Sequence, residues 1–256
     1  MKKISLLLLL LGIFVASCST RENQLEIVAH RGINHLAPEN TMASTQKCIE
    51  LNVDYVEIDV RRSKDNVFYI IHDRTLDRTT NGTGAVSDTL SSYIDTLDAG
   101  SWFSTEFKGE KVPRLEPLLK ALKGQTKIYF DVKTDGLKEL VDLVYQSGFE
   151  KDCFFWFSKN SRAKQLRDID ENLTLKMTAH DVNGLKKAME YHPQIIECRL
   201  EELTPEFVTF CRKNKLKIMV NALSKGSEKT YQKIINSPAD MVNLDRADLM
   251  IGLTTK

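Results

Sequence analysis

Titratable side chains stand at the ends of three short apolar runs in the first third of the sequence. The three segments are VAHR at 28–31, VEID at 56–59 and IIHD at 70–73. An apolar run read with a period of two predicts a strand. Ionisable groups at the end of a buried strand are costly unless they are paired or bind a metal. Three runs that end alike therefore predict one shared site.

Two carboxylates of the second segment share one face. Glu57 and Asp59 are two residues apart, so in a strand their side chains point the same way. Carboxylates side by side repel each other unless a cation or a proton lies between them. Hard divalent cations with oxygen ligands are the usual solution. This pair therefore predicts a metal site.

The third segment must fold back on the second. Few residues separate the predicted strand at 55–60 from the one at 67–72, whereas parallel neighbours need a crossover of about a dozen residues or more. The polar link at 63–66 (SKDN) suits the turn of an antiparallel hairpin. Folding back about this link places His72 roughly opposite Ile58, next to the paired carboxylates.

Further motifs surround these segments. HRG and PENT are followed by E-x-D, a turn, and then IHD with RTTNGTG. This series resembles the glycerophosphodiester phosphodiesterase family, closely over residues 27–133 and more loosely, though in order, to about residue 248. The resemblance implies a TIM barrel whose site hydrolyses a phosphodiester with a divalent cation.

Roles follow from the resemblance by position. His30 and His72 would be the acid–base pair. Glu57 and Asp59 would be metal ligands, and Arg31 would hold the phosphate.

A further strand, IYFDVK at 128–133, adds two residues to this set. Asp131 and Lys133 share a face. The family usually has Glu where this chain has Asp131, but aspartate is a competent oxygen ligand and we expect it to be the third one. Lys133 would contact the phosphate, or would form a salt bridge to Asp131 or Glu57. The expected cofactor is one divalent cation, Ca²⁺ or Mg²⁺.

The order of elements favours a barrel. Candidate strands recur with helical patterns between them, for example at 41–51 and 137–147. The strands are expected at 26–31, 55–60, 126–133, 153–158, 173–179, 194–199, 216–222 and 240–245. Eight such units favour a (β/α)8 TIM barrel of the α/β class. A doubly wound open sheet is the alternative, but the first strand is not followed by GxGxxG.

Residues 74–116, after the second barrel strand, form the longest interruption. RTTNGTG is rich in turn residues, and an aromatic cluster follows at Ser101-Trp102-Phe103. We expect a small insertion here. Its aromatic residues would form either a satellite hydrophobic cluster under a long loop or a wall for the alcohol part of a substrate.

Other polar residues leave alternatives open. Asn40 or Thr41 could cap the first helix, and Glu39 could reach the site. Glu197 could face the barrel mouth or pair with Arg199.

The second half also departs from the family. Ile218 stands where the family often has Trp, so part of the expected pocket wall is missing. His180 either ends a strand or caps the next helix.

Composition is that of an ordinary globular chain. Its 256 residues are 42% hydrophobic and 28% charged, with a formal net charge of +1. Because nucleic-acid binding usually needs a basic surplus, we expect none. Beyond Cys18, four cysteines are widely spaced without a CxxC, which disfavours a zinc site and favours buried thiols.

The N-terminus resembles a bacterial lipoprotein leader. Lys2-Lys3 precedes an apolar stretch at 4–15, too short to span a bilayer comfortably. Val15-Ala16-Ser17-Cys18 resembles a lipobox. This predicts a signal peptide at 1–17, a lipidated tether at 18–24 and the barrel domain at 25–256, exported and membrane-anchored through Cys18. A plain secretory signal is the alternative.

The resemblance, together with the residues that carry it, implies an enzyme that hydrolyses small glycerophosphodiesters to glycerol phosphate and an alcohol. One rival is a phospholipase C or D acting on intact lipid, which shares the barrel and paired histidines and would need an exposed apolar rim. The other is a non-catalytic surface lipoprotein that binds phosphodiesters. Two proton carriers argue against the binder, because binding alone does not need them.

Overall fold

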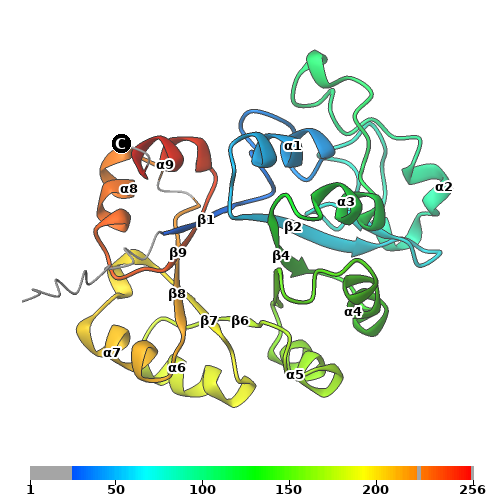
Figure 1. Cartoon of the computed structure of the whole chain (residues 1–256). Coiled ribbons are helices and arrows are strands. Elements are labelled where there is room, and N and C mark those ends of the chain that lie inside the picture. Colours follow the sequence, from blue (N-terminus) through cyan, green and yellow to red (C-terminus); the bar gives the residue numbers. More distant parts are fainter. Residues whose placement is uncertain (1–24, 224–225, 255–256) are drawn as a thin grey trace, which may run out of the picture.

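The computed structural model describes residues 25–223 and 226–254. Eight parallel strands form a barrel (Figure 1), in the order β5-β4-β2-β1-β9-β8-β7-β6. Their bounds are β1 Glu26–Ala29, β2 Tyr55–Arg62, β4 Lys127–Val132, β5 Cys153–Trp156, β6 Lys176–Thr178, β7 Ile195–Cys198, β8 Lys217–Asn221 and β9 Met241–Leu244. The barrel closes where Phe155 N donates to Thr174 O at 2.9 Å. The predicted (β/α)8 TIM barrel is confirmed.

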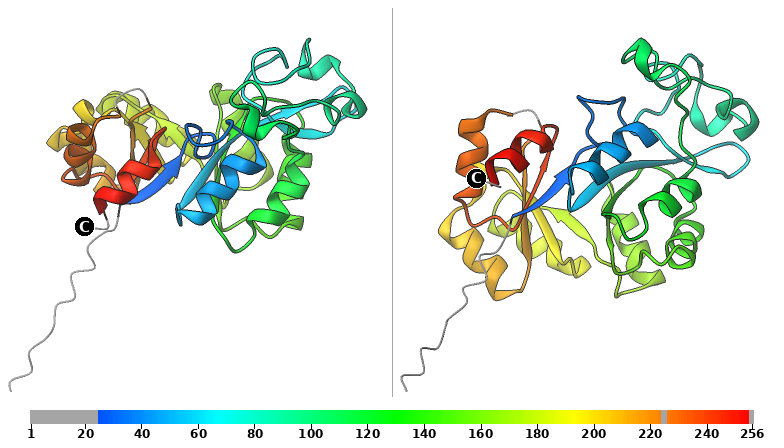
Figure 2. Two further views of the ribbon diagram at one scale, coloured as in Figure 1. Left: turned by 90° about the horizontal axis from the view of Figure 1, so that it is seen from above. Right: turned by 45° about the horizontal axis from the view of Figure 1, so that its top comes forward.

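Helices surround the barrel (Figures 1 and 2). They are α1 Met42–Glu50, α3 Leu115–Leu122, α4 Leu137–Gln146, α5 Asn160–Ile169, α6 Val182–Ala188, α7 Pro205–Lys213, α8 Glu228–Ile235 and α9 Ala247–Thr254. Alternation along β2 explains its composition. Val56 and Ile58 pack in the main core under the helices, so Glu57 and Asp59 must point into the barrel.

A short strand, β3 (Phe68–Ile70), pairs antiparallel with the end of β2. Val60 is opposite Ile70, and Ile71 N donates to Asp59 O at 2.9 Å. Continuing this register by two residues places His72 opposite Ile58. The predicted hairpin and its register are therefore correct.

The segment between β3 and α3 stands apart from the barrel (Figure 2). It contains α2 (Ser91–Ile94) and two short 3₁₀ helices, Val86–Asp88 and Thr105–Phe107. Its apolar residues, such as Leu76, form a separate hydrophobic cluster with Tyr69 of β3. Trp102 is outside that cluster and 41% exposed.

The four cysteines within the described ranges, Cys48, Cys153, Cys198 and Cys211, are buried free thiols, as expected. No helix in the part of the chain that the structure describes is long and apolar enough to cross a bilayer. The predicted leader, lipobox and tether, residues 1–24, lie outside the described residues.

Candidate active site

Three buried carboxylates meet at the C-terminal end of the barrel strands. Glu57 and Asp59 come from β2. Asp131 comes from the neighbouring strand β4, where it is paired with Asp59. One oxygen of each lies within 4.8 Å of the others. We call these three residues the acidic triad. The structure thus brings all three predicted metal ligands together.

The electrostatics of the acidic triad fit a bound cation. Burial, followed by repulsion from Asp59 and Asp131, raises the pKa of Glu57 well above its ordinary value. Burial and Asp59 also raise the pKa of Asp131. Among the described residues, none donates a hydrogen bond to the buried Oδ1 of Asp59. Repelling carboxylates, one of which has an oxygen without a hydrogen-bond donor, are a suitable ligand set for a hard divalent cation.

Lys133 lies directly against the acidic triad. Its Nζ is 2.6 Å from Asp131 Oδ2 and 3.2 Å from Asp59 Oδ1. The second contact is an ion pair without hydrogen-bond geometry, which is why that oxygen still lacks a donor. Burial alone would lower the pKa of Lys133, but Asp59 and Asp131 raise it. The salt bridge to Asp131 considered from the sequence is therefore present.

Arg31 supports the acidic triad through its backbone and its side chain. Arg31 N donates to Glu57 Oε2 at 2.7 Å, and its Nε lies 3.4 Å from Asp59 Oδ2. Its φ of 57° is left-handed, which is costly for a residue with a side chain. The two contacts to the carboxylates help to hold this conformation in place.

Glu39 reaches the site by way of two arginines. Its carboxylate accepts from Arg31 Nη1 at 2.9 Å and from Arg78 at 2.7 and 2.9 Å. Burial would raise the pKa of Glu39, but Arg78 and Arg31 lower it. Glu39 therefore stays ionised and orients the guanidinium of Arg31.

His30 follows β1 and is held by a carboxylate at the end of β9. Its Nδ1 lies 2.7 Å from Asp245 Oδ1, which also accepts from Asn34 Nδ2 at 2.7 Å. Burial would raise the pKa of Asp245, but the hydrogen bonds from His30 and Asn34 lower it. An ionised carboxylate only accepts hydrogen bonds, so His30 donates from Nδ1 and keeps Nε2 for other partners.

His72 has the same kind of support. Its Nδ1 lies 2.7 Å from Asp73 Oδ1. Arg61, which follows Asp59 on the inward face of β2, donates to His72 O at 2.7 and 2.9 Å. His72 and Asn40 line one small cavity, and Asn40 Nδ2 donates to Asp59 Oδ2 at 2.7 Å. The second histidine thus lies next to the acidic triad.

Some neighbours were missed from the sequence. Of the two cap candidates, Thr41 caps α1, as the sequence allowed. Asn40 binds Asp59 instead, a contact that the sequence did not predict. Asp245 is an acidic residue directly after the strand β9. A titratable residue at the end of a strand is the same signal that identified the other site residues. His180 contacts Glu202, and the cap of α6 is Asp181.

A second polar group lies inside the barrel. Glu197 does not pair with Arg199, which instead contacts Glu202. The carboxylate of Glu197 accepts hydrogen bonds from Lys176 Nζ, 2.5 Å away, and from Asn221 Nδ2 at 3.1 Å.

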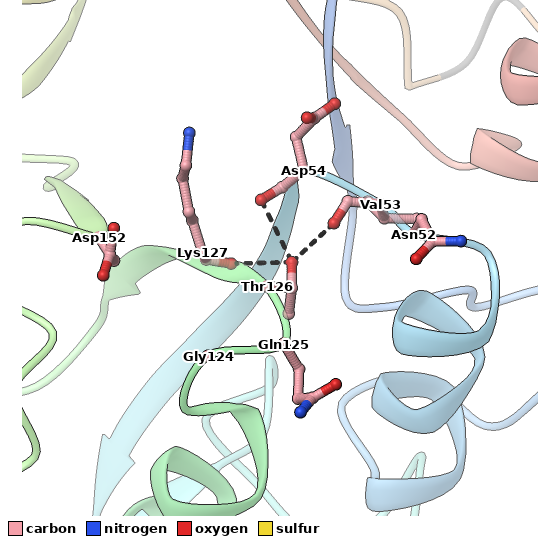
Figure 3. Close-up of a pocket in the computed structure, with 8 residues that line it drawn as sticks. All are labelled: Asn52, Val53, Asp54, Gly124, Gln125, Thr126, Lys127 and Asp152. Atoms are coloured by element: carbon pink, nitrogen blue, oxygen red, sulfur yellow. Dashed lines mark hydrogen bonds between the residues drawn. The ribbon is translucent and has the colours of Figure 1, made fainter.

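A hollow of about 340 Å³ lies at the N-terminal ends of the barrel strands, opposite the acidic triad (Figure 3). We call this end the barrel floor. Its lining is Asn52, Val53, Asp54, Gly124, Gln125, Thr126, Lys127 and Asp152. The hydroxyl of Thr126 contacts main-chain oxygens of Val53, Asp54 and Lys127. Because the strands of a TIM barrel carry their catalytic groups at the other end, we assign this hollow no catalytic role.

Comparisons with known proteins agree with the site. The model of the glycerophosphoryl diester phosphodiesterase family matches residues 30–180. A glycerophosphodiester phosphodiesterase of Caldanaerobacter subterraneus subsp. tengcongensis is 29% identical over 90% of this chain and 98% of its own. The crystal structure of such an enzyme from Agrobacterium tumefaciens is 39% identical, with a TM-score of 0.83 over 89% of this chain and 99% of its own.

A more distant structure shares the fold. It is an Oleispira antarctica phosphodiesterase in complex with the product sn-glycerol-3-phosphate, with 23% identity and a TM-score of 0.79 over 90% of this chain and 96% of its own. The family match covers the acidic triad, both predicted catalytic histidines, Arg31 and Lys133. The chain therefore belongs to the glycerophosphoryl diester phosphodiesterase family and is an enzyme that hydrolyses glycerophosphodiesters.

Proposed function

We propose that this hydrolysis depends on a divalent cation and on His30 and His72 as the acid–base pair. One observation carries the proposal: two histidines lie beside residues that contact the acidic triad, each with Nδ1 on a carboxylate. This arrangement fixes the ring and leaves Nε2 to exchange a proton. The natural substrate class is a small glycerophosphodiester, in keeping with the product bound to the Oleispira enzyme.

Charge neutralisation is the first requirement, because the diester anion repels nucleophiles. A Ca²⁺ or Mg²⁺ ion held by Glu57, Asp59 and Asp131 would supply it. Arg31 and Lys133, both beside the acidic triad, would bind the phosphate oxygens from the protein side.

Proton transfer is the second requirement. One histidine accepts at Nε2 the proton of the attacking water, or of a neighbouring substrate hydroxyl whose cyclic phosphate water then opens. The other donates a proton to the leaving alkoxide. Asp245 and Asp73 orient the two rings and stabilise their protonated forms.

The test is hydrolysis of a panel of glycerophosphodiesters, with intact phospholipid vesicles as a further substrate. We expect product from the soluble diesters, loss of activity in excess chelator, and recovery with Ca²⁺ or Mg²⁺. Full activity after demonstrated removal of metal would exclude the cation. Faster turnover of intact lipid would favour the phospholipase alternative.

We also propose that the protein is an exported lipoprotein anchored through Cys18. The support is the basic pair, the short apolar stretch and the lipobox-like Val15-Ala16-Ser17-Cys18. Cys18→Ser should remove the protein from the membrane fraction or leave it unprocessed. Fractionation like that of the parent would contradict the proposal.

A further inference from the structure

Three polar residues inside the barrel contact one another: Lys176 on β6, Glu197 on β7 and Asn221 on β8. Lys176 Nζ lies 2.5 Å from Glu197 Oε2 and donates to Tyr129 OH at 2.8 Å. Lys176 Nζ also lies 4.7 Å from the ring centroid of Trp156, which is a cation–π contact. Asn221 Nδ2 donates to the other oxygen of Glu197 at 3.1 Å. We call Lys176, Glu197 and Asn221 the neutral polar cluster.

This cluster is unusual for a barrel interior, which is normally filled by Val, Ile and Leu. Lys176 is 1% exposed and Glu197 is 6% exposed. Desolvation of a buried ion pair offsets much of its attraction, so apolar residues of similar size are often as stabilising or more so. Stability alone therefore does not account for the pair.

The cluster borders the active site. Tyr129 precedes Asp131 by two residues on β4, so both side chains point inward. On the other side, β8 pairs with β9, and Asn221 lies opposite Asn243. β9 leads directly to Asp245, the partner of His30. Asn221 therefore lies on the strand next to the one that leads to the partner of His30.

The cluster also faces the open mouth. Thr178 follows Lys176 by two residues on the same face of β6 and is exposed. Asn221 and Trp156 are partly exposed. Asn243 is 3% exposed, and no described residue donates to its Oδ1. An oxygen without a hydrogen-bond donor among the described residues therefore lies next to the cluster, on β9.

We infer that the neutral polar cluster recognises the terminal hydroxyl of the glyceryl arm, with Glu197 as its acceptor and Asn221 beside it. This inference rests on the proposed function, because it assigns one arm of the same diester. Lys176 balances the charge of Glu197, so the cluster suits an uncharged hydroxyl better than the cation of a choline or ethanolamine arm. A hydroxyl can donate to a carboxylate oxygen and accept from an amide NH₂ group.

The test uses two diesters that differ in one group: glycerophosphocholine and 2-hydroxypropyl phosphocholine. Both keep the hydroxyl next to the ester, and only the first has the terminal hydroxyl. With saturating cation, we expect kcat/KM to favour the glyceryl diester by roughly 10–100-fold in the parent, as for a hydrogen bond to a charged group.

Two variants address the cluster. Glu197→Gln replaces a charged acceptor with a neutral one and should lower the ratio of the two kcat/KM values. Because Glu197→Gln leaves Lys176 buried without its counter-charge, Lys176→Met/Glu197→Met is the second variant, which removes both charges and is expected to fold. Lys127→Met is the matched control, since it breaks an ion pair to Glu26 at the barrel floor and should keep the parental ratio.

The outcomes separate the two proposals. A parent that hydrolyses neither diester contradicts the proposed function before any variant is made. A parent that treats both diesters alike, or folded cluster variants that keep the parental ratio, overturns the inference alone. Equal loss of both activities in the double variant also overturns it, because the cluster would then act on the common part of the substrates.

Discussion

Asn40 and Asp59 hold each other through two hydrogen bonds. Asn40 Nδ2 donates to Asp59 Oδ2 at 2.7 Å, and Asp59 N donates to Asn40 Oδ1 at 3.2 Å. The φ of Asn40 is 56°, a left-handed conformation that asparagine tolerates better than most residues. The loop before α1 thereby fixes the orientation of a carboxylate on β2.

Asn40→Gly should weaken cation binding by about 10–100-fold, the usual effect of removing a residue that orients a metal ligand. Glycine keeps the backbone conformation, so the loss reports on the two hydrogen bonds. Titration calorimetry with Ca²⁺ or Mg²⁺ measures it. Asn66→Gly is the matched control, because Asn66 also has a positive φ, 68°, but lies in the β2–β3 turn. Equal affinities in both variants would contradict this role.

His30→Ala and His72→Ala should each reduce kcat by roughly 10²–10⁴-fold, the range expected for general acid–base catalysis. The double variant should lose less than the product, because both residues act on one transition state. Affinity for a non-hydrolysable diester should change little. His180→Ala, at a mostly exposed histidine, should retain activity. Folded histidine variants with near-parental turnover would make both residues structural.

Asp245→Asn should reduce kcat by about 10–100-fold, because His30 loses the carboxylate that orients it. Its stability effect should depend on pH. Since the folded pKa of Asp245 lies below the ordinary 3.8, its contribution is complete above 3.8 and is lost as the pH falls through the folded value. Thermal melts of parent and variant should therefore differ at pH 7 and converge in acid. A constant difference across this range would be inconsistent with the lowered pKa.

Glu57→Gln should stabilise the metal-free protein at pH 8. Burial, followed by Asp59 and Asp131, raises the folded pKa of Glu57 above 4.5. The carboxylate therefore destabilises the fold increasingly as the pH rises from 4.5 toward the folded pKa. Below 4.5 the effect should vanish. The parent should gain about 2.7 kcal/mol from a cation at 100 times Kd, and the variant should gain much less.

Thermal melts of the parent and of Glu57→Gln, with chelator and with cation, test both the stabilisation of the metal-free variant and its smaller gain from the cation. Glu26→Gln, at the barrel floor, is the control and should keep the cation response. An unchanged response in Glu57→Gln would remove Glu57 from the ligand set.

The barrel and much of the site were predictable because their signals are local. Alternation along residues 55–60 placed Glu57 and Asp59 on one face, and the short link at 63–66 required a hairpin. The register that puts His72 opposite Ile58 followed from that link alone, and the structure has it. Seven of the eight barrel strands were predicted one to three residues too long at one or both ends, because their flanking residues turn toward loops. The end of β2 was instead predicted two residues too short, because pairing with β3 extends the strand to Arg62.

Other contacts depend on tertiary proximity and left no local signal. Asn40 stands at a position that suits a helix cap, and only the packing of its loop against β2 gives it Asp59. Glu197 had Arg199 two residues away, yet its partner Lys176 comes from the neighbouring strand. Charge pairs between strands require the strand order, which a local pattern does not contain.

The two histidines belong to different packing units. His30 follows Ala29, which is part of the main core, whereas His72 follows Ile71, which is part of the smaller cluster between β3 and α3. Such units can open separately, with free energies below that of global unfolding. Opening of the smaller unit alone would displace His72 while the barrel stays folded. The enzyme therefore has access to an inactive state that circular dichroism would count as native, and its activity should disappear at a lower temperature than its helical signal.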